Sequence, residues 1–293
     1  MFSQTLSPDN EYATKVERLI GENTDLTRDL ENWMAKLPLS LRSLPIIYLA
    51  IPGSHDSFTS DISSASDISP DSEKILRDLR WIICVKVVIA NWTKTQNLRV
   101  TNQLMVGIRY FDLRTSTKRA SNDLYFCHGL YSCKVGPVLK EIGTFLETHS
   151  GELIVIYRSD AARFGQPLLW PSASFPTPWA DTMDPNTLFN YLDEAITNRT
   201  DQVSLITQCI LTPSLADIIG NIFTSLKKKL AIDFEDQRTG WISKQIPGRK
   251  GVNIIIGDFV DLADNLFIKA VINLNLKLLS DLPRRLQSKK TMA

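Results

Sequence analysis

The chain has 293 residues, of which 43% are hydrophobic and 22% charged, a composition typical of a globular protein with a substantial core. Lys and Arg number 33 against 32 Asp and Glu, and this near-neutral balance gives no indication of nucleic-acid binding. The first residues, MFSQTLSPDNEY, are polar and unlike a signal peptide, and no apolar run reaches the ~20 residues that span a bilayer. We therefore expect a cytoplasmic protein without a transmembrane segment.

The predicted elements are short apolar strands that alternate with amphipathic helices. In chain order we expect helix 11–36, strand 46–51 with an exit through Pro52-Gly53, helical segments within 74–105, strands 107–114 and 124–129, helix 135–149, strand 152–157, a further short strand near 175–179, helix 186–197, strand 203–209, helix 213–230, a polar loop, strand 252–259 and helix 262–279. This alternation predicts a parallel α/β architecture such as a (β/α) barrel. We assign the barrel to residues 32–280, an N-terminal helical extension to 1–31 and a basic tail to 281–293.

Reactive side chains follow several of the predicted strands at the point where each strand ends. They are His55 and Asp56 after the first strand, Asp112 and Arg114 at the end of the second, His128 at the end of the third and Asp258 at the end of the last. In a parallel barrel these strand ends meet at one edge, where the chemistry of such folds takes place. The sequence therefore predicts one site built from these six residues.

Two histidines and an arginine at one site suit phosphodiester chemistry. A neutral imidazole accepts a proton from the attacking hydroxyl, a protonated one gives a proton to the leaving oxygen, and a guanidinium offsets charge on the phosphoryl group. Each residue also has a structural interpretation: a hydrogen-bonding histidine, an Asp112–Arg114 ion pair, a helix cap at Asp258. A metal site formed by His55, Asp56, Asp112 and Asp258 is a further alternative, although Arg114 would bring a positive charge to it. For His149, in the segment THSGE before a predicted strand and not at a strand end, we expect a structural role.

Five segments carry a resemblance to a known family. LAIPGSHDS, TQNLRVTNQLMVGIRYFDLR, LYFCHGLY, NIIIGDFV and FIKAVINLN resemble the phosphatidylinositol-specific phospholipase C X-domain-containing proteins, in order and over most of the chain. The resemblance implies a distorted TIM barrel that cleaves phosphatidylinositol to diacylglycerol and an inositol phosphate. It also implies a phosphoinositide lipid as substrate and transient contact with a membrane surface.

The resemblance gives each site residue a role. It makes His55 the general base for the inositol 2-hydroxyl with Asp258 as its carboxylate partner, and His128 the general acid paired with Asp56. Arg114 corresponds to the arginine that contacts the phosphate, with Asp112 two residues before it. An arginine here resembles the metal-independent type, so we expect no cofactor and no calcium.

The middle of the chain departs from the family pattern. HSGELIVIYRSDAARFGQPLLWP joins the start of one family strand to the end of the next, which predicts a barrel that lacks one strand–helix unit, on the order of 30 residues or more. A basic residue at the end of the fourth family strand is lost. Arg158 lies nearby and is our candidate for substrate binding beside Arg114, although its alternation relative to Glu152 is off by one. We therefore expect weak or absent activity.

Two other functions remain open on the sequence. One is a non-catalytic phosphoinositide or membrane-surface binding protein, in which Arg114 and the basic tail (Arg284, Arg285, Lys289, Lys290) hold anionic headgroups. The other is a metal-dependent phosphodiester hydrolase on the same barrel.

Overall fold

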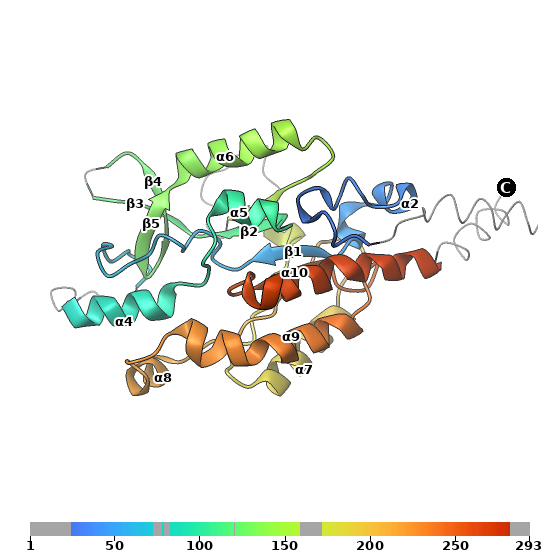
Figure 1. Ribbon diagram of the computed structural model, residues 1–293. Helices are drawn as coiled ribbons and strands as arrows, with labels where there is room; N and C mark the ends of the chain where they lie inside the picture. Colours follow the sequence, from blue (N-terminus) through green and yellow to red (C-terminus); the bar gives the residue numbers. More distant parts are fainter. Residues whose placement is uncertain (1–24, 73–77, 79–82, 120, 159–171, 282–293) are drawn as a thin grey trace, which may run out of the picture.

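A parallel sheet lies at the centre of the protein (Figure 1). The computed structural model describes residues 25–72, 78, 83–119, 121–158 and 172–281, and within them the sheet has five strands in the order β6-β2-β1-β8-β7. These are Ile51–Ser54 (β1), Tyr110–Leu113 (β2), Val155–Arg158 (β6), Ile206–Gln208 (β7) and Ile254–Gly257 (β8). All neighbouring pairs are parallel, so the carboxyl ends of the strands meet at one edge. The fold is a distorted and incomplete α/β barrel, as predicted.

Helices cover the sheet. They are Leu39–Arg42 (α2), Ile83–Thr93 (α4), Val100–Met105 (α5), Val135–Thr148 (α6), Pro185–Thr197 (α7), Leu215–Gly220 (α8), Ile232–Lys244 (α9) and Leu262–Leu274 (α10). Short 3-10 turns lie at Leu30–Asn32 (η1), Ile46–Tyr48 (η2), Ser172–Ser174 (η4) and Asn275–Asp281 (η6), and a π-helical turn at Lys227–Ala231 (η5) leads into α9. Helix α10 packs against β1 and α9, and its apolar face shares one core with the isoleucines of β8. An unbroken apolar strand such as β8 suits burial on both faces.

The first strand differs from its prediction. Residues Ile46–Tyr48 form a 3-10 turn, and the strand instead runs through Pro52 and Gly53, where we expected it to end. Pairing decides this, because β1 lies between β2 and β8, and the Pro52 carbonyl still accepts the Arg109 N–H at 3.0 Å. Gly53 fits there because a Cβ atom would lie 2.7 Å from Tyr110 and 2.9 Å from the Ile256 side chain.

The third predicted strand belongs to a different sheet. Leu124–His128 (β4) pairs antiparallel with Thr115–Thr117 (β3) and Leu130–Lys134 (β5), so our expectation of a parallel barrel strand at 124–129 is wrong. The turn from β4 to β5 passes through Gly129 at φ 67°, a left-handed conformation that glycine adopts without steric strain. His128, just before this turn, therefore approaches the site from an antiparallel ribbon.

Two helix predictions are wrong in part. The helix expected over 11–36 falls partly on residues 1–24, which lie outside the described residues, and between 25 and 36 the chain forms turns around η1. The polar loop expected after residue 230 is helix α9. Its buried face contains Glu235, Arg238 and Thr239 beside apolar residues, and this mixture hides the helical period in the sequence. The basic tail 282–293 also lies outside the described residues.

A buried ion pair fixes the N-terminal end of β6. The Arg109 Nε lies 2.7 Å from a Glu152 carboxylate oxygen, and both side chains are fully buried. The remaining guanidinium nitrogens donate to backbone carbonyls, including that of Glu31, while the Glu152 carboxylate also accepts the Ala35 N–H at 2.8 Å. Because its donors are satisfied inside the protein, the pair holds residues 31–35 against the barrel.

The segment 174–182 covers the free edge of β7 without forming a strand. The Ser204 and Ile206 N–H groups donate to the carbonyls of Ser174 and Pro176, at 3.0 and 2.9 Å. Pro176 has no N–H with which to continue a ladder, which explains why the strand expected near 175–179 is absent from this part of the structure. Strands β6 and β7 are the two edges of the five-stranded sheet. The ring centroid of Phe175, beside β7, lies 6.3 Å from that of Tyr157 on β6. Of the residues that the structure describes, none belongs to a helix long and apolar enough to cross a bilayer.

Candidate active site

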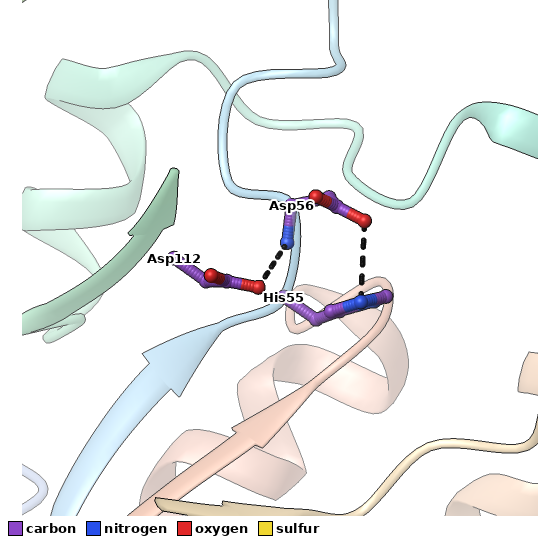
Figure 2. A group of neighbouring side chains, drawn as sticks. All are labelled: His55, Asp56 and Asp112. Atoms are coloured by element: carbon purple, nitrogen blue, oxygen red, sulfur yellow. Dashed lines mark hydrogen bonds and ion pairs between the residues drawn. The ribbon is translucent and has the colours of Figure 1, made fainter. Parts of the chain in front are cut away.

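His55 lies at the carboxyl end of β1, between two carboxylates. Its Nδ1 lies 2.8 Å from an Asp258 carboxylate oxygen, and its Nε2 lies 3.2 Å from Asp56 Oδ2 (Figure 2 shows the Asp56 contact). Asp258 follows the end of β8, the direct neighbour of β1 in the sheet. The predicted proximity of His55 and Asp258, 203 positions apart in the chain, is therefore present. Because Asp258 accepts the Nδ1 proton, Nε2 is the nitrogen that faces the site.

Asp56 is the centre of the cluster. Its carboxylate contacts three basic groups: His55, the His128 Nε2 at 3.4 Å and the Arg114 Nε at 2.9 Å. These are ion-pair distances, and neither carboxylate oxygen has a well-aligned hydrogen bond within the described residues. The backbone of Asp56 has φ 39°, a left-handed conformation that aspartate tolerates better than most residues. The sequence predicts a pairing of Asp56 with His128 alone, whereas the structure shares this carboxylate among all three groups.

His128 reaches the site from the end of β4. Its Nδ1 lies 2.7 Å from the backbone carbonyl of Thr93, at the end of α4, and its ring centroid lies 6.2 Å from that of His55. The Thr93 carbonyl can only accept, so Nδ1 carries the proton and Nε2 points to Asp56. Gly129 permits this approach, because a Cβ atom there would lie 2.8 Å from the Thr93 side chain. Both imidazoles are therefore held at Nδ1 by an acceptor. For His55 the acceptor is the Asp258 carboxylate, and for His128 it is the Thr93 backbone carbonyl.

Arg114 and Asp112 complete the group on the β2 side. The carboxylate of Asp112 lies next to the backbone of Asp56. It accepts the Asp56 backbone N–H at 3.4 Å (Figure 2). Arg114 lies just beyond the strand, with a side chain that is 43% exposed, whereas that of Asp56 is 1% exposed. The open side of the site is therefore formed by Arg114 and by His128, whose side chain is 22% exposed.

The neighbouring charges and burial raise the pKa values of His55 and Asp112 and lower that of Asp56. Burial lowers the pKa of His55, but the carboxylates of Asp56 and Asp258 outweigh it and raise this pKa to about 9. Burial alone would raise the pKa of Asp56, yet His128, His55 and Arg114 hold it below its ordinary value. The pKa of Asp112 is raised, first by burial and then by the charge of Asp56. Of the two neighbouring carboxylates Asp56 and Asp112, Asp56 is therefore the one that stays ionised more readily.

Two residues that support the site carry no signal in the sequence pattern. Gln96 is fully buried, and its side-chain amide donates to the carbonyls of His55 and Gly257 at 3.0 and 2.9 Å, which ties the exits of β1 and β8 together. The Thr95 hydroxyl lies 3.1 Å from the carbonyls of both His55 and Asp56. Thr95 and Gln96 begin the segment TQNLRVTNQLMVGIRYFDLR, which resembles the family. The resemblance marks the segment, but it does not show that these two side chains hold the backbone around His55.

Arg158 and His149 are the other two residues that the sequence analysis singled out. Arg158 ends β6 opposite Leu113, but its side chain lies outside the described part of the structure. His149 caps the end of α6, where its ring stacks on that of Phe145 at a centroid distance of 3.9 Å and its Nδ1 lies 2.9 Å from the Phe145 carbonyl. This placement agrees with a structural role for the third histidine.

Three of these residues could also hold a metal ion. His55, Asp56 and Asp112 each offer a ligand atom, and the three atoms lie within 4.8 Å of one another (Figure 2). The surrounding contacts oppose a cation, because the Arg114 guanidinium already lies against Asp56 and carries a fixed positive charge. The donor set is thus suited to a metal in type but not in its electrostatic surroundings.

Comparison with known proteins identifies relatives over most of the chain. PI-PLC X domain-containing protein 3 from Bos taurus is 34% identical over 301 residues, covering 83% of this chain and 93% of the relative, and the Homo sapiens protein of the same name is also 34% identical. PI-PLC X domain-containing protein 2 from Mus musculus is 34% identical over 83% of this chain. No protein-family model matches the sequence.

Solved structures of bacterial enzymes share the fold. A variant of the phosphatidylinositol-specific phospholipase C from Staphylococcus aureus has a TM-score of 0.58 at 16% identity, over 86% of this chain and 98% of the bacterial chain. The phosphatidylinositol-specific phospholipase C from Listeria monocytogenes has a TM-score of 0.50 at 16% identity.

The alignment lengths show that this chain is shorter than a relative over the matched region. The matched part of this chain is 83% of 293 residues, about 243, whereas the bovine alignment extends over 301 residues, so about 58 residues of the relative have no counterpart here. This deficit exceeds the roughly 30 residues of a single strand–helix unit. Identity at this level over most of both sequences shows that the chain belongs to the family of PI-PLC X domain-containing proteins.

Proposed function

We propose that the protein is a phosphodiesterase that cleaves phosphatidylinositol-type lipids by metal-independent acid–base catalysis. The observation that carries the proposal is the pair of oriented imidazoles. His55 and His128 each have Nδ1 held by an acceptor and Nε2 directed at the same ionised carboxylate, Asp56. Two imidazoles held in this way can act as the base and the acid in cleavage of one phosphodiester.

The buried imidazole suits the base. In the proposed step the His55 Nε2 removes the proton of the inositol 2-hydroxyl, and the oxygen attacks the phosphorus to form a new P–O bond. Asp258, at Nδ1, stabilises the imidazolium that results. Asp56 has carboxylate oxygens without aligned hydrogen bonds in the described structure, so it can accept a bond from a substrate hydroxyl.

The more exposed imidazole suits the acid. As the P–O bond to diacylglycerol breaks, the electron pair stays on the glycerol oxygen, and the protonated His128 gives that oxygen a proton. The products are diacylglycerol and a cyclic inositol phosphate. Arg114 offsets charge on the phosphoryl oxygens as it builds up. Because His128 and Arg114 form the open side of the site, the lipid part of the substrate faces outward and the inositol ring faces His55.

The position of Arg114 supports the metal-independent form of the proposal. Its guanidinium supplies the positive charge that a calcium ion would provide, and a cation bound by Asp56 would be repelled by it. We also expect the rate to be low, because within the described residues the sheet has five parallel strands where a complete barrel has eight, so fewer strands there can form the wall around the inositol ring.

Turnover of phosphatidylinositol by the purified chain tests the proposal. We expect slow release of inositol phosphate that persists with a chelator and is lost in His55→Ala and in His128→Ala. His149→Ala is the matched control, because this histidine lies at the end of α6 and contacts no site residue in the described structure. Activity that disappears with the chelator would support the metal-dependent alternative instead. Lipid binding without turnover, unchanged in both site variants, would support the non-catalytic alternative.

A further inference from the structure

A buried arginine contacts the backbone of the candidate active site. Arg238 lies on α9, which packs beside α10 (Figure 1), and it is only 1% exposed. Its Nη1 donates to the backbone carbonyl of Asp258 at 2.9 Å, while its Nη2 pairs with the Glu235 carboxylate one turn earlier. Phe267 of α10 covers the guanidinium, with the Cζ atom 4.5 Å from the ring centroid. Arg238 therefore holds the residue whose side chain holds His55.

The peptide group between Asp258 and Phe259 is fixed at both of its polar ends. It lies just beyond the end of β8, outside the ladder of the sheet. Its carbonyl accepts from Arg238, and its N–H, that of Phe259, donates to the Thr95 carbonyl at 2.7 Å. Phe259 has φ 45°, a conformation that is unfavourable for a bulky side chain and persists only where the surrounding contacts impose it. These two contacts therefore hold the turn on which the Asp258 carboxylate depends.

The last residue of β8 leaves room for the guanidinium. A Cβ atom on Gly257 would lie 2.6 Å from the Arg238 Nη1 and 3.2 Å from the Phe267 ring. Any larger residue at this position would push the guanidinium away from the carbonyl that it reaches. The strand end, the arginine and the phenylalanine that covers it thus fit one another around the Asp258 backbone.

Stability alone does not account for a charge at this position. The Arg238 Nε is buried without a hydrogen-bond partner among the described residues, so the guanidinium is only partly satisfied. A buried ion pair such as Arg238–Glu235 is often no more stabilising than two apolar residues of similar volume. An apolar side chain could fill the same space, but it could not donate to the Asp258 carbonyl. The donor is what the arginine adds.

We propose that Arg238 is a positioning residue that fixes the Asp258 carboxylate against His55 by holding the Asp258 carbonyl. The inference rests on the proposed function, in which His55 is the base. Without the Nη1 donor, the peptide group after Asp258 can rotate and release the left-handed conformation of Phe259. The carboxylate then leaves the His55 Nδ1, from which it now lies 2.8 Å. Arg238 touches no reacting atom in this scheme and acts only through Asp258.

The test variant removes the donor together with the charge that it balances. In the full chain, Arg238→Met is combined with Glu235→Leu, so that no unpaired charge stays buried and the fold is kept. Arg199→Met is the matched control. Arg199 is also a buried arginine that donates to backbone carbonyls, but those of Ile47 and Gly251 precede β1 and β8, at the amino ends of the strands. Urea denaturation establishes that each variant is folded.

The Nδ1 proton of His55 reports the geometry by proton NMR, without any need for turnover. A buried imidazole proton that is hydrogen-bonded to a carboxylate resonates downfield and exchanges slowly with water, and His55 is only 7% exposed. The chain has three histidines, so the signal is assigned by its absence from His55→Ala. We expect it to persist in Arg199→Met, and to move upfield and exchange faster in the double variant.

Turnover of a short-chain phosphatidylinositol dissolved as monomers reports the consequence for the chemistry. We expect kcat of the double variant to fall by about ten- to hundredfold, because a displacement of about 1 Å at a catalytic group can have an effect of this size. KM should be unchanged, because the buried Arg238 makes no contact with the substrate. Arg199→Met should retain both values.

The outcomes separate the positioning role from the proposed chemistry. An unchanged His55 signal in the folded double variant would overturn the inference, and so would equal loss of the signal in Arg199→Met. If the double variant does not fold, Arg238→Lys decides by the same criterion, since a lysine keeps the charge beside Glu235 but lacks the fork that reaches Asp258 as well. Absent turnover by the unmodified chain, with the signal behaving as expected, would count against the proposed function only.

Discussion

Replacement of Asp258 by asparagine tests whether this carboxylate sets the proton affinity of His55. The asparagine side-chain oxygen can still accept the Nδ1 proton, so Asp258→Asn removes the charge 2.8 Å from the ring and keeps the hydrogen bond. The pKa of His55 stands at about 9 because Asp56 and Asp258 together outweigh the effect of burial. Loss of one opposite charge at this distance lowers a pKa by about one to three pH units.

The assay is the pH dependence of kcat/KM with a short-chain phosphatidylinositol dissolved as monomers. This quantity reports ionisation of the free protein. Because the base must be neutral and the acid protonated, the profile should be bell-shaped, and the limb that His55 governs should lie near pH 9. In Asp258→Asn the same limb should lie about one to three pH units lower.

Asp264→Asn provides the control, because Asp264 is 86% exposed, pairs with Lys269 and has a left-handed backbone that asparagine also accepts. The profile of this variant should match that of the unmodified chain. Profiles with both limbs at the same pH in Asp258→Asn and in the unmodified chain would refute the electrostatic argument.

Two predictions concern stability. Gly53→Ala should lower the free energy of unfolding by about 1–3 kcal/mol, because the added Cβ atom would meet side chains on both flanking strands at 2.7 and 2.9 Å. Urea denaturation measures this, and Gly143→Ala, in α6 with nothing within 4 Å, should be neutral or stabilising; equal midpoints for both variants would contradict the packing argument. The second prediction follows from the pKa of His55, which is about 9 in the folded chain and 6.5 when unperturbed. Its stabilising contribution of roughly 3 kcal/mol is complete below pH 6.5 and is lost as the pH rises to 9, so the stability difference between the unmodified chain and His55→Gln should shrink over that range. A difference that is constant with pH would contradict it.

Much of the fold could be predicted because the strands and several helices have local patterns. The apolar run of β8 and the amphipathic period of α6 appear at or near their predicted positions. The errors occur where distant contacts override the local pattern. Pro52 and Gly53 read as the end of a strand, yet pairing on both sides keeps them within β1. Helix α9 was not predicted because buried polar residues such as Arg238 interrupt its apolar period. The Arg238 guanidinium donates to the backbone carbonyl of Asp258, a partner outside the helix that no local pattern reveals.

The sequence by itself determined the types of residue at the site, the family to which they point and the incomplete form of the barrel. His55, Asp56 and Asp258 could be placed together because parallel strands end at one edge of a sheet. Only the tertiary structure decided how His128 arrives, since an antiparallel partner differs from a parallel one in long-range pairing and not in local sequence. It alone identified the Thr93 carbonyl as the group that orients His128, because every residue has a backbone carbonyl and the sequence cannot single one out.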